Sequence, residues 1–268
     1  MTSSSFYRAS IGCIAIISYS LGHASATADI TEYSAGHTDI RIAFRNDELQ
    51  LLYHFGESAV LDGVEQVGFD SEGSADSAFV RVSPATQTDF AFPIDFLGTG
   101  ANDPVWILPQ SNSGTGGAAA LGAPFFGIAT HQLSGSQFES VFLNMTDFAG
   151  PGEFALFQSP TLPFLPPTVF WQTNDGIQTE DGDDSLDVGV IGHDHYNYGF
   201  TQEGIYDVKL TATADLVGGG SISSAEETFR FVVGNVTAIP EPGSFALVVL
   251  SVAAWCWRGR RRRPAIAA

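Results

Sequence analysis

Two histidines separated by a single residue, His193 and His195, are the strongest candidates for chemistry in this sequence. If they lie on a β-strand, a spacing of two places both imidazole rings on one face, where they could bind one metal ion. Imidazole nitrogens suit zinc, copper or nickel. The competing interpretation is that both histidines are structural and hydrogen-bond to the backbone. The spacing by itself leaves both interpretations open.

Other motifs with chemical meaning are scarce. The sequence contains no nucleophile elbow, zinc-protease helix, phosphate-binding loop or Cys-His arrangement, so we expect no enzymatic activity and assign no catalytic residue. A run of acidic residues could bind calcium, but it lacks the EF-hand pattern, and a solvated acidic loop is the favoured interpretation. The run comprises Asp175, Glu180, Asp181, Asp183, Asp184 and Asp187.

The elements that must position the histidines are predicted to be short strands. Hydrophobic residues alternate over short stretches, and turn residues recur every eight to twelve positions, which is typical of sandwiches and barrels. Glycine-rich stretches at residues 98–103 and 110–122 are expected to be loops. The predicted strands are residues 38–44, 48–55, 79–82, 140–145, 152–158, 168–172, 187–190, 205–214 and 225–233.

The last two predicted strands show the pattern most clearly. Apolar residues alternate with polar ones in both strands, which is typical of a strand with one buried and one solvent-exposed face. Gly218, Gly219 and Gly220 are expected to form the turn between the two strands. Tyr206 is a candidate corner tyrosine of an immunoglobulin-like sandwich. The fold class predicted is all-β, an antiparallel immunoglobulin-like β-sandwich. Its core should include Phe44, Leu51, Trp106, Phe154, Leu156, Tyr206, Val208, Leu210, Phe229 and Phe231.

Charge limits the partners of this domain. Residues 29–239 hold 29 of the 30 acidic residues but only five of the 11 basic ones. Such a surface repels phosphate backbones and anionic headgroups, so we expect no nucleic-acid partner. Both cysteines, Cys13 and Cys256, lie outside this region, which therefore has no disulfide.

The two ends of the chain have the character of targeting segments. Residues 1–28 combine an early arginine, an apolar run and small residues before Ala26, the pattern of a secretory signal peptide. At the other end, Pro240, Glu241 and Pro242 precede the apolar stretch 245–257, which is short for a spanning helix. A basic cluster follows, and positive charges stay on the cytoplasmic side. The cluster comprises Arg258, Arg260, Arg261, Arg262 and Arg263.

This tail resembles the PEP-CTERM sorting signal, because the motif, the hydrophobic segment and the arginine cluster occur in the same order at the C-terminus. The resemblance implies that residues 239–268 are recognised by an exosortase-type membrane enzyme. Pro240, Glu241 and Pro242 would be the recognition residues. The protein would be exported, held transiently in the membrane by a C-terminal sorting helix, and delivered to the cell envelope or extracellular matrix. An ordinary tail anchor is the alternative.

Residues 33–234 resemble the choice-of-anchor M family, which shares a domain with actinobacterial surface-anchored proteins. The stretches that carry the resemblance are GHTDI at 36–40, VWILPQ at 105–110, GPGEFALFQ at 150–158 and HDHYNYGFT at 193–201, followed by GIY at 204–206. The resemblance implies one extracellular domain, here residues 29–238, joined to different anchors. In actinobacterial relatives the domain also occurs in the binding protein of a transporter, which implies capture of a ligand at the cell surface.

With this family pattern, His37 and the pair His193 and His195 become expected neighbours at one end of the sandwich. The candidate metal ligands are therefore His37, His193, His195 and His54, with zinc or another divalent transition metal as the ion. The family often has a second histidine two residues before His54, where this chain has Leu52. His131 stands where no histidine is expected, and it could compensate for the missing ligand or have no role.

The function expected from these features is a non-enzymatic exported binding module that captures a transition metal or a metal-bearing ligand. The alternative is an architectural matrix protein whose histidines are structural and whose acidic faces interact with extracellular polysaccharide and cations. Secretion machinery and an exosortase-type enzyme are the expected processing partners. Extracellular polysaccharide or a surface transport system are further expected partners.

Overall fold

The computed structural model describes residues 30–160, 165–178 and 184–236. Strands dominate this part of the chain, and its only α-helix is the single turn α1 (Ala118–Leu121), beside 3-10 turns at Ala75–Ser77, Pro84–Thr86 and Asp95–Leu97. The all-β class is therefore confirmed. None of the described helices is long and apolar enough to span a membrane. The expected signal peptide, the sorting motif and the arginine cluster lie outside the described residues.

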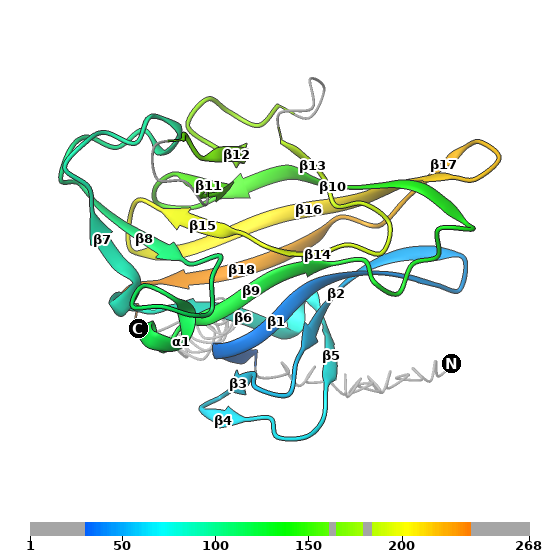
Figure 1. Cartoon of the computed structure of the whole chain (residues 1–268), viewed down its shortest axis with the longest axis horizontal. Helices are drawn as coiled ribbons and strands as arrows, with labels where there is room; N and C mark the ends of the chain where they lie inside the picture. The colour runs from blue at the N-terminus through cyan, green and yellow to red at the C-terminus, as the bar shows by residue number, and fades with distance from the viewer. Residues whose placement is uncertain (1–29, 161–164, 179–183, 237–268) are drawn as a thin grey trace, which may run out of the picture.

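Two layers of β-sheet pack against each other (Figure 1). The first layer is a sheet in which each strand pairs with the next, and the short β17 (Ser221–Ser223) is added on β16. In spatial order this sheet contains β13 (Ser185–Asp187), β10 (Phe138–Ala149), β16 (Gly204–Leu216), β18 (Glu227–Val233) and β6 (Ala78–Val82).

The second layer has two parts. One part contains β5 (Ser71–Ser74), β2 (Glu48–Phe55), β1 (Thr31–Arg45), β9 (Pro124–Ala129) and β14 (His193–His195), in that spatial order. The other part is a separate sheet of β12 (Thr168–Gln172), β11 (Phe154–Gln158), β15 (Asn197–Phe200), β8 (Pro104–Leu108) and β7 (Gln87–Asp89). The small hairpin of β3 (Val60–Leu61) and β4 (Val64–Glu65) pairs with the start of β1.

Strand β1 joins the two layers because it changes partners at Gly36. Before this glycine β1 runs parallel to β6, and after it β1 lies between β2 and the parallel strand β9. Gly36 has a φ of 78°, and a Cβ there would lie 1.7 Å from the carbonyl oxygen of Ser58, so only glycine fits. Since β18 also runs parallel to β6, the expectation of a purely antiparallel arrangement is wrong. The large sheet is mixed, and long connections separate its parallel partners, whereas the five-stranded sheet is antiparallel throughout.

Aromatic side chains from β18 fill the space between the layers. The ring of Phe229 lies 5.0 Å from that of Tyr53 on β2, and Phe231 contacts Phe126 on β9 and Phe200 on β15. All five side chains are buried or nearly so. Burial of this apolar area is the main contribution that holds the layers together.

Most of the predicted core is confirmed. Nine of the ten residues are buried, whereas Phe44 is half-buried, because β1 ends at the next residue and its ring packs edge-on against Phe138 at the rim. The Tyr206 hydroxyl donates to the carbonyl oxygen of Gln202 at 2.8 Å and accepts from its N–H at 3.1 Å. This is the hydrogen bonding expected of a corner tyrosine.

The strand predictions agree with the structure where a strand has one buried face and one solvent-exposed face. The ranges 48–55 and 168–172 agree with β2 and β12, but the range 187–190 is displaced from β13 (Ser185–Asp187). Strands β8, β9 and β15 were missed because most of their residues are buried, which removes the alternation of apolar and polar side chains. The expected loop 110–122 also contains α1, one helical turn that ends at Gly122 with a φ of 57°.

Candidate metal centre

His37, Asp39, His193 and His195 meet on the outer face of the second layer. His37 and Asp39 are two residues apart on β1, and His193 and His195 are two residues apart on β14, so each pair points to one side of its strand. Strand β9 lies between β1 and β14. The structure therefore contains the predicted approach of His37 to the two late histidines.

Gly127 on β9 is the reason that the two strands can share a site. The register pairs it with Asp39 on one side and with His195 on the other. A Cβ at Gly127 would lie 2.4 Å from Asp39 Oδ1 and 2.8 Å from His195 Cε1. Because glycine has no side chain, Asp39 and His195 meet over β9 instead of being separated by it.

The four side chains are close enough to share one ion. Each offers a potential ligand atom, and these atoms all lie within 4.8 Å of one another. Asp39 Oδ1 is the common neighbour, at 3.0 Å from His193 Nε2 and 3.4 Å from His37 Nε2. The ring centres of the three histidines are 5.1 to 5.4 Å apart.

Neighbouring groups fix the imidazoles. The ring of Phe125 stacks on that of His195, with centres 3.6 Å apart and an angle of 5° between the planes. The backbone N–H of His37 donates a hydrogen bond to the hydroxyl of Ser58, which belongs to the turn after β2. The hydroxyl of Thr130 accepts from the N–H of Gly192 and so anchors the start of β14. These contacts hold the ring of His195 and the backbone beside His37 and His193.

Burial and unsatisfied polar atoms mark this site. Asp39 is 1% exposed, although a carboxylate is rarely buried without a partner of opposite charge. Among the described residues, Asp39 Oδ2 and His195 Nδ1 are buried polar atoms without a hydrogen-bond partner. Buried polar groups usually have partners, and unsatisfied atoms at this position are compatible with a site that holds an ion or water.

The protonation states favour a cation. Burial alone would raise the pKa of Asp39, but the hydrogen bond with His37 and the charges of the three imidazoles outweigh burial and lower it. Burial lowers the pKa of His195 to about 4. Asp39 is therefore a carboxylate and His195 a neutral imidazole near neutral pH, and these are the forms that bind metals.

The remaining two described histidines lie beside the four-residue group. His54 on β2 is opposite Asp39 in the register, and its Nδ1 is 3.7 Å from Asp39 Oδ2. The ring of exposed His131 is 6.1 Å from the rings of both His54 and His193, and Arg41 lies 3.2 Å from its Nε2. All five histidines of the described chain thus gather around one buried carboxylate.

Three imidazole nitrogens and one carboxylate oxygen fit a divalent transition metal. Ligands of tetrahedral zinc lie about 2.0 to 2.2 Å from the ion, so the four atoms need only small side-chain rotations to converge. Thiolates are absent from the donor set, which disfavours the softer ions. His37, Asp39, His193 and His195 are the residues that could hold the ion.

Sequence reasoning missed Asp39, although a signal was present. In the stretch GHTDI, Asp39 follows His37 by two residues, the same spacing that was used for His193 and His195. A strand places both side chains on one face. What the spacing could not reveal is that Asp39 is buried, because the covering side chains come from β2 and β14.

One acidic residue of the run at 175–187 is not solvated as expected. Asp184 is 1% exposed, and its carboxylate accepts hydrogen bonds from the N–H groups of Gln172 and Gln178. It holds the segment after β12 against the sheet. Glu180, Asp181 and Asp183 lie outside the described residues.

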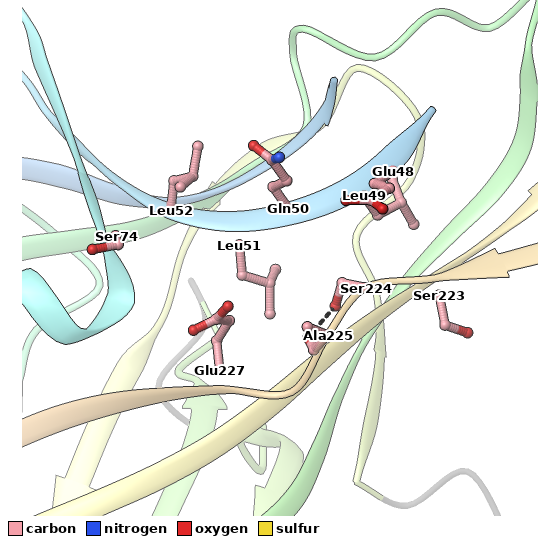
Figure 2. Close-up of a pocket in the computed structure, with 10 residues that line it drawn as sticks. All are labelled: Glu48, Leu49, Gln50, Leu51, Leu52, Ser74, Ser223, Ser224, Ala225 and Glu227. Carbon is pink, nitrogen blue, oxygen red and sulfur yellow. Dashed lines mark hydrogen bonds between the residues drawn. The ribbon is translucent and has the colours of Figure 1, made fainter. Parts of the chain in front are cut away.

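A separate polar cavity of about 500 Å³ opens between β2 and the segment that leads into β18 (Figure 2). Leu51 and Glu227 both border it, as Figure 2 shows, and no histidine, lysine or arginine lines it. It therefore has no part in metal binding by imidazoles. Its lining consists of Glu48, Leu49, Gln50, Leu51, Leu52, Ser74, Ser223, Ser224, Ala225 and Glu227.

Comparison with known proteins identifies the tail. Residues 238–262 match the PEP-CTERM protein-sorting motif, which indicates an exported protein that exosortase machinery recognises and sorts to the cell envelope. No curated protein and no solved structure matches the chain. The resemblance to the choice-of-anchor M family has no support from these comparisons and stays a prediction.

Proposed function

We propose that this chain is an exported, non-enzymatic binding module that captures a divalent transition metal, zinc first, at the cell surface or in the extracellular matrix. His37, Asp39, His193 and His195 are the proposed ligands. The single observation that carries the proposal is the convergence of three imidazoles on the buried carboxylate of Asp39.

The exposure of the site supports capture of an ion from outside. The side chain of His193 is 41% exposed and that of His37 is 29% exposed, so an ion can reach the group from solvent. The non-enzymatic part of the proposal rests on the sequence, which contains no nucleophile elbow, zinc-protease helix, phosphate-binding loop or Cys-His arrangement. The PEP-CTERM motif supports delivery to the surface.

The partners and the finer fold assignment belong to the same proposal. Secretion machinery and an exosortase-type enzyme would process the chain, with Pro240, Glu241 and Pro242 as the recognised residues. A surface transport system could receive the bound ion. The immunoglobulin-like character of the sandwich is supported by the corner hydrogen bonds of Tyr206.

Zinc titration by calorimetry tests this function. We expect the protein, expressed from its full sequence and stripped with a chelator, to bind one zinc ion per chain. His195→Ala removes one of four ligands and should abolish this stoichiometric binding, because the remaining group is incomplete. The far-ultraviolet circular dichroism should remain β-rich, since the imidazole contributes little to the core.

His131→Ala is the matched control, because this exposed histidine lies outside the four ligands. It should bind zinc as the unmodified protein does. Unchanged binding in His195→Ala, or no stoichiometric binding by the unmodified protein, would contradict the proposed function and leave the histidines with a structural role.

An architectural matrix protein is the second candidate, and the polar cavity beside Leu51 favours it. Carboxylate, amide and hydroxyl groups line this cavity, and such groups can hydrogen-bond to the hydroxyls of extracellular polysaccharide. The lining has no aromatic ring on which a sugar could stack. Protein that binds polysaccharide but no zinc would support this candidate over metal capture.

A further inference from the structure

The proposed metal centre uses one carboxylate oxygen of Asp39, Oδ1, and leaves the second oxygen, Oδ2, without a metal contact. Oδ1 faces His37 and His193, the ligands with the shortest contacts. Oδ2 faces β2 instead, where His54 lies opposite Asp39 in the strand register. A carboxylate whose two oxygens face two different groups can bind an ion through one oxygen and accept a hydrogen bond through the other.

His54 is placed to supply that hydrogen bond. Its Nδ1 is buried without a hydrogen-bond partner among the described residues, and so is Asp39 Oδ2, which lies 3.7 Å away. Two unsatisfied buried polar atoms of opposite kind that face each other are an unusual combination, because each loses its hydrogen bonds to water on burial and gains none in return. A movement of less than 1 Å would satisfy both.

The outer end of His54 lies beside a second carboxylate. Its Nε2 lies 3.3 Å from Oδ2 of Asp70, which is half-exposed at the entrance to β5. The side chain of His54 is only 12% exposed, so the sheet and Asp70 restrict the orientation of its ring. Ligating carboxylates in metal proteins are commonly fixed by such outer hydrogen bonds.

We infer that His54 is a positioning residue of the metal centre: it orients Asp39 as a ligand through an Nδ1–H to Oδ2 hydrogen bond. This inference rests on the proposed metal-binding function. It differs from the sequence prediction, in which His54 is itself a ligand. The geometry favours positioning because His54 approaches the oxygen of Asp39 that faces away from His37 and His193.

Amide variants of His54 test the inference, because each amide replaces one ring nitrogen. His54→Asn keeps a donor near the position of Nδ1, facing Asp39, whereas His54→Gln keeps one near Nε2, facing Asp70. We expect zinc affinity to fall about 10- to 100-fold in His54→Gln and in His54→Leu. His54→Asn should recover most of this loss. All three variants should still bind one ion per chain in calorimetry.

Cobalt is the spectroscopic probe, since the visible bands of bound Co²⁺ report its ligand set. Positioning predicts the same bands in the unmodified protein, His54→Gln and His54→Asn, with only the binding constant changed. His131→Leu is the matched control, because its ring lies near His54 and His193 but has no contact with Asp39 Oδ2. It should change neither the affinity nor the bands.

The outcomes separate this inference from the proposed function. Altered cobalt bands in the His54 variants would show that His54 is a ligand, and unchanged zinc affinity would show that it has no role; either result overturns the inference and leaves metal capture intact. Equal losses in His54→Asn and His54→Gln would also overturn it. No metal binding by the unmodified protein would overturn both.

Discussion

Asp39 is the buried carboxylate around which the five histidines of the described chain lie. It is buried on the face of β1 that a sandwich usually exposes, and imidazoles from β1, β2 and β14 surround it. A buried carboxylate is costly unless cations or hydrogen-bond donors compensate it. Three imidazoles and an ion would supply that compensation, so the carboxylate and the histidines depend on each other.

At the residue scale, Gly127 gives the sharpest test of this packing. Gly127→Ala should weaken zinc binding by at least about tenfold, because the new Cβ would displace Asp39 and His195, and metal ligands tolerate shifts of only about 0.5 Å. The overpacking should also cost about 1 to 3 kcal/mol of unfolding free energy. Calorimetry measures the first effect and urea unfolding the second.

Gly135→Ala is the control for this substitution. A Cβ at Gly135 would meet nothing within 4 Å, and its φ is not positive. Zinc affinity and stability should therefore be unchanged. Equal behaviour of the two alanine variants would show that the close approach at Gly127 does not control the site.

At the element scale, the corner after Thr201 fixes the entry of the chain into β16. The hydroxyl of Tyr206 makes two hydrogen bonds to the backbone of Gln202 while its ring is buried. This closes the turn that precedes the longest strand pairing of the first layer, between β16 and β10. The corner thus ties a local turn to the packing of the whole layer.

Tyr206→Phe should cost about 1 to 3 kcal/mol of unfolding free energy, because it leaves the backbone N–H and carbonyl of Gln202 without their partner. Tyr198→Phe is the matched control. Its hydroxyl is buried without a hydrogen-bond partner among the described residues, so its removal should change stability by less than about 0.5 kcal/mol or increase it. Urea unfolding measures the free energy of unfolding of both variants. Equal losses of stability in the two variants would contradict the role of the corner.

At the scale of the whole molecule, the negative charge of the surface suits an exported protein that binds cations. All five lysines and arginines among the described residues form ion pairs with carboxylates. The many remaining acidic residues leave a strongly negative surface, which keeps an exported protein soluble and raises the local concentration of cations. A cation-binding centre on such a surface gains from this attraction.

The sorting motif leads to a prediction for the intact protein. Protein recovered from the surface of its own host should end near Pro240 and lack residues 245–268, because exosortase machinery is expected to remove the tail. Intact-mass measurement gives the answer. A control variant with Pro240 and Glu241 both replaced by alanine should keep its tail. A complete tail on correctly delivered protein would support an ordinary membrane anchor.

Much of the organisation of this protein could be predicted from local sequence. The strand at residues 48–55 and most of the core follow from alternation, since each has one buried and one wet face. The side-by-side placement of His193 and His195 follows from strand geometry alone. The PEP-CTERM sorting motif is a linear motif that needs no fold for its recognition. In each case the information lies within a few neighbouring residues.

The arrangement of the candidate metal centre was decided only by the tertiary structure. It depends on β9, a strand that alternation could not reveal because it is buried on both faces, and on the register that aligns Asp39, Gly127 and His195 across three strands. The contact between Asp39 and His193 joins residues 154 positions apart. A shift of one residue in any of these strands would turn its side chains to the opposite face, so the site exists only when the long-range pairing is complete.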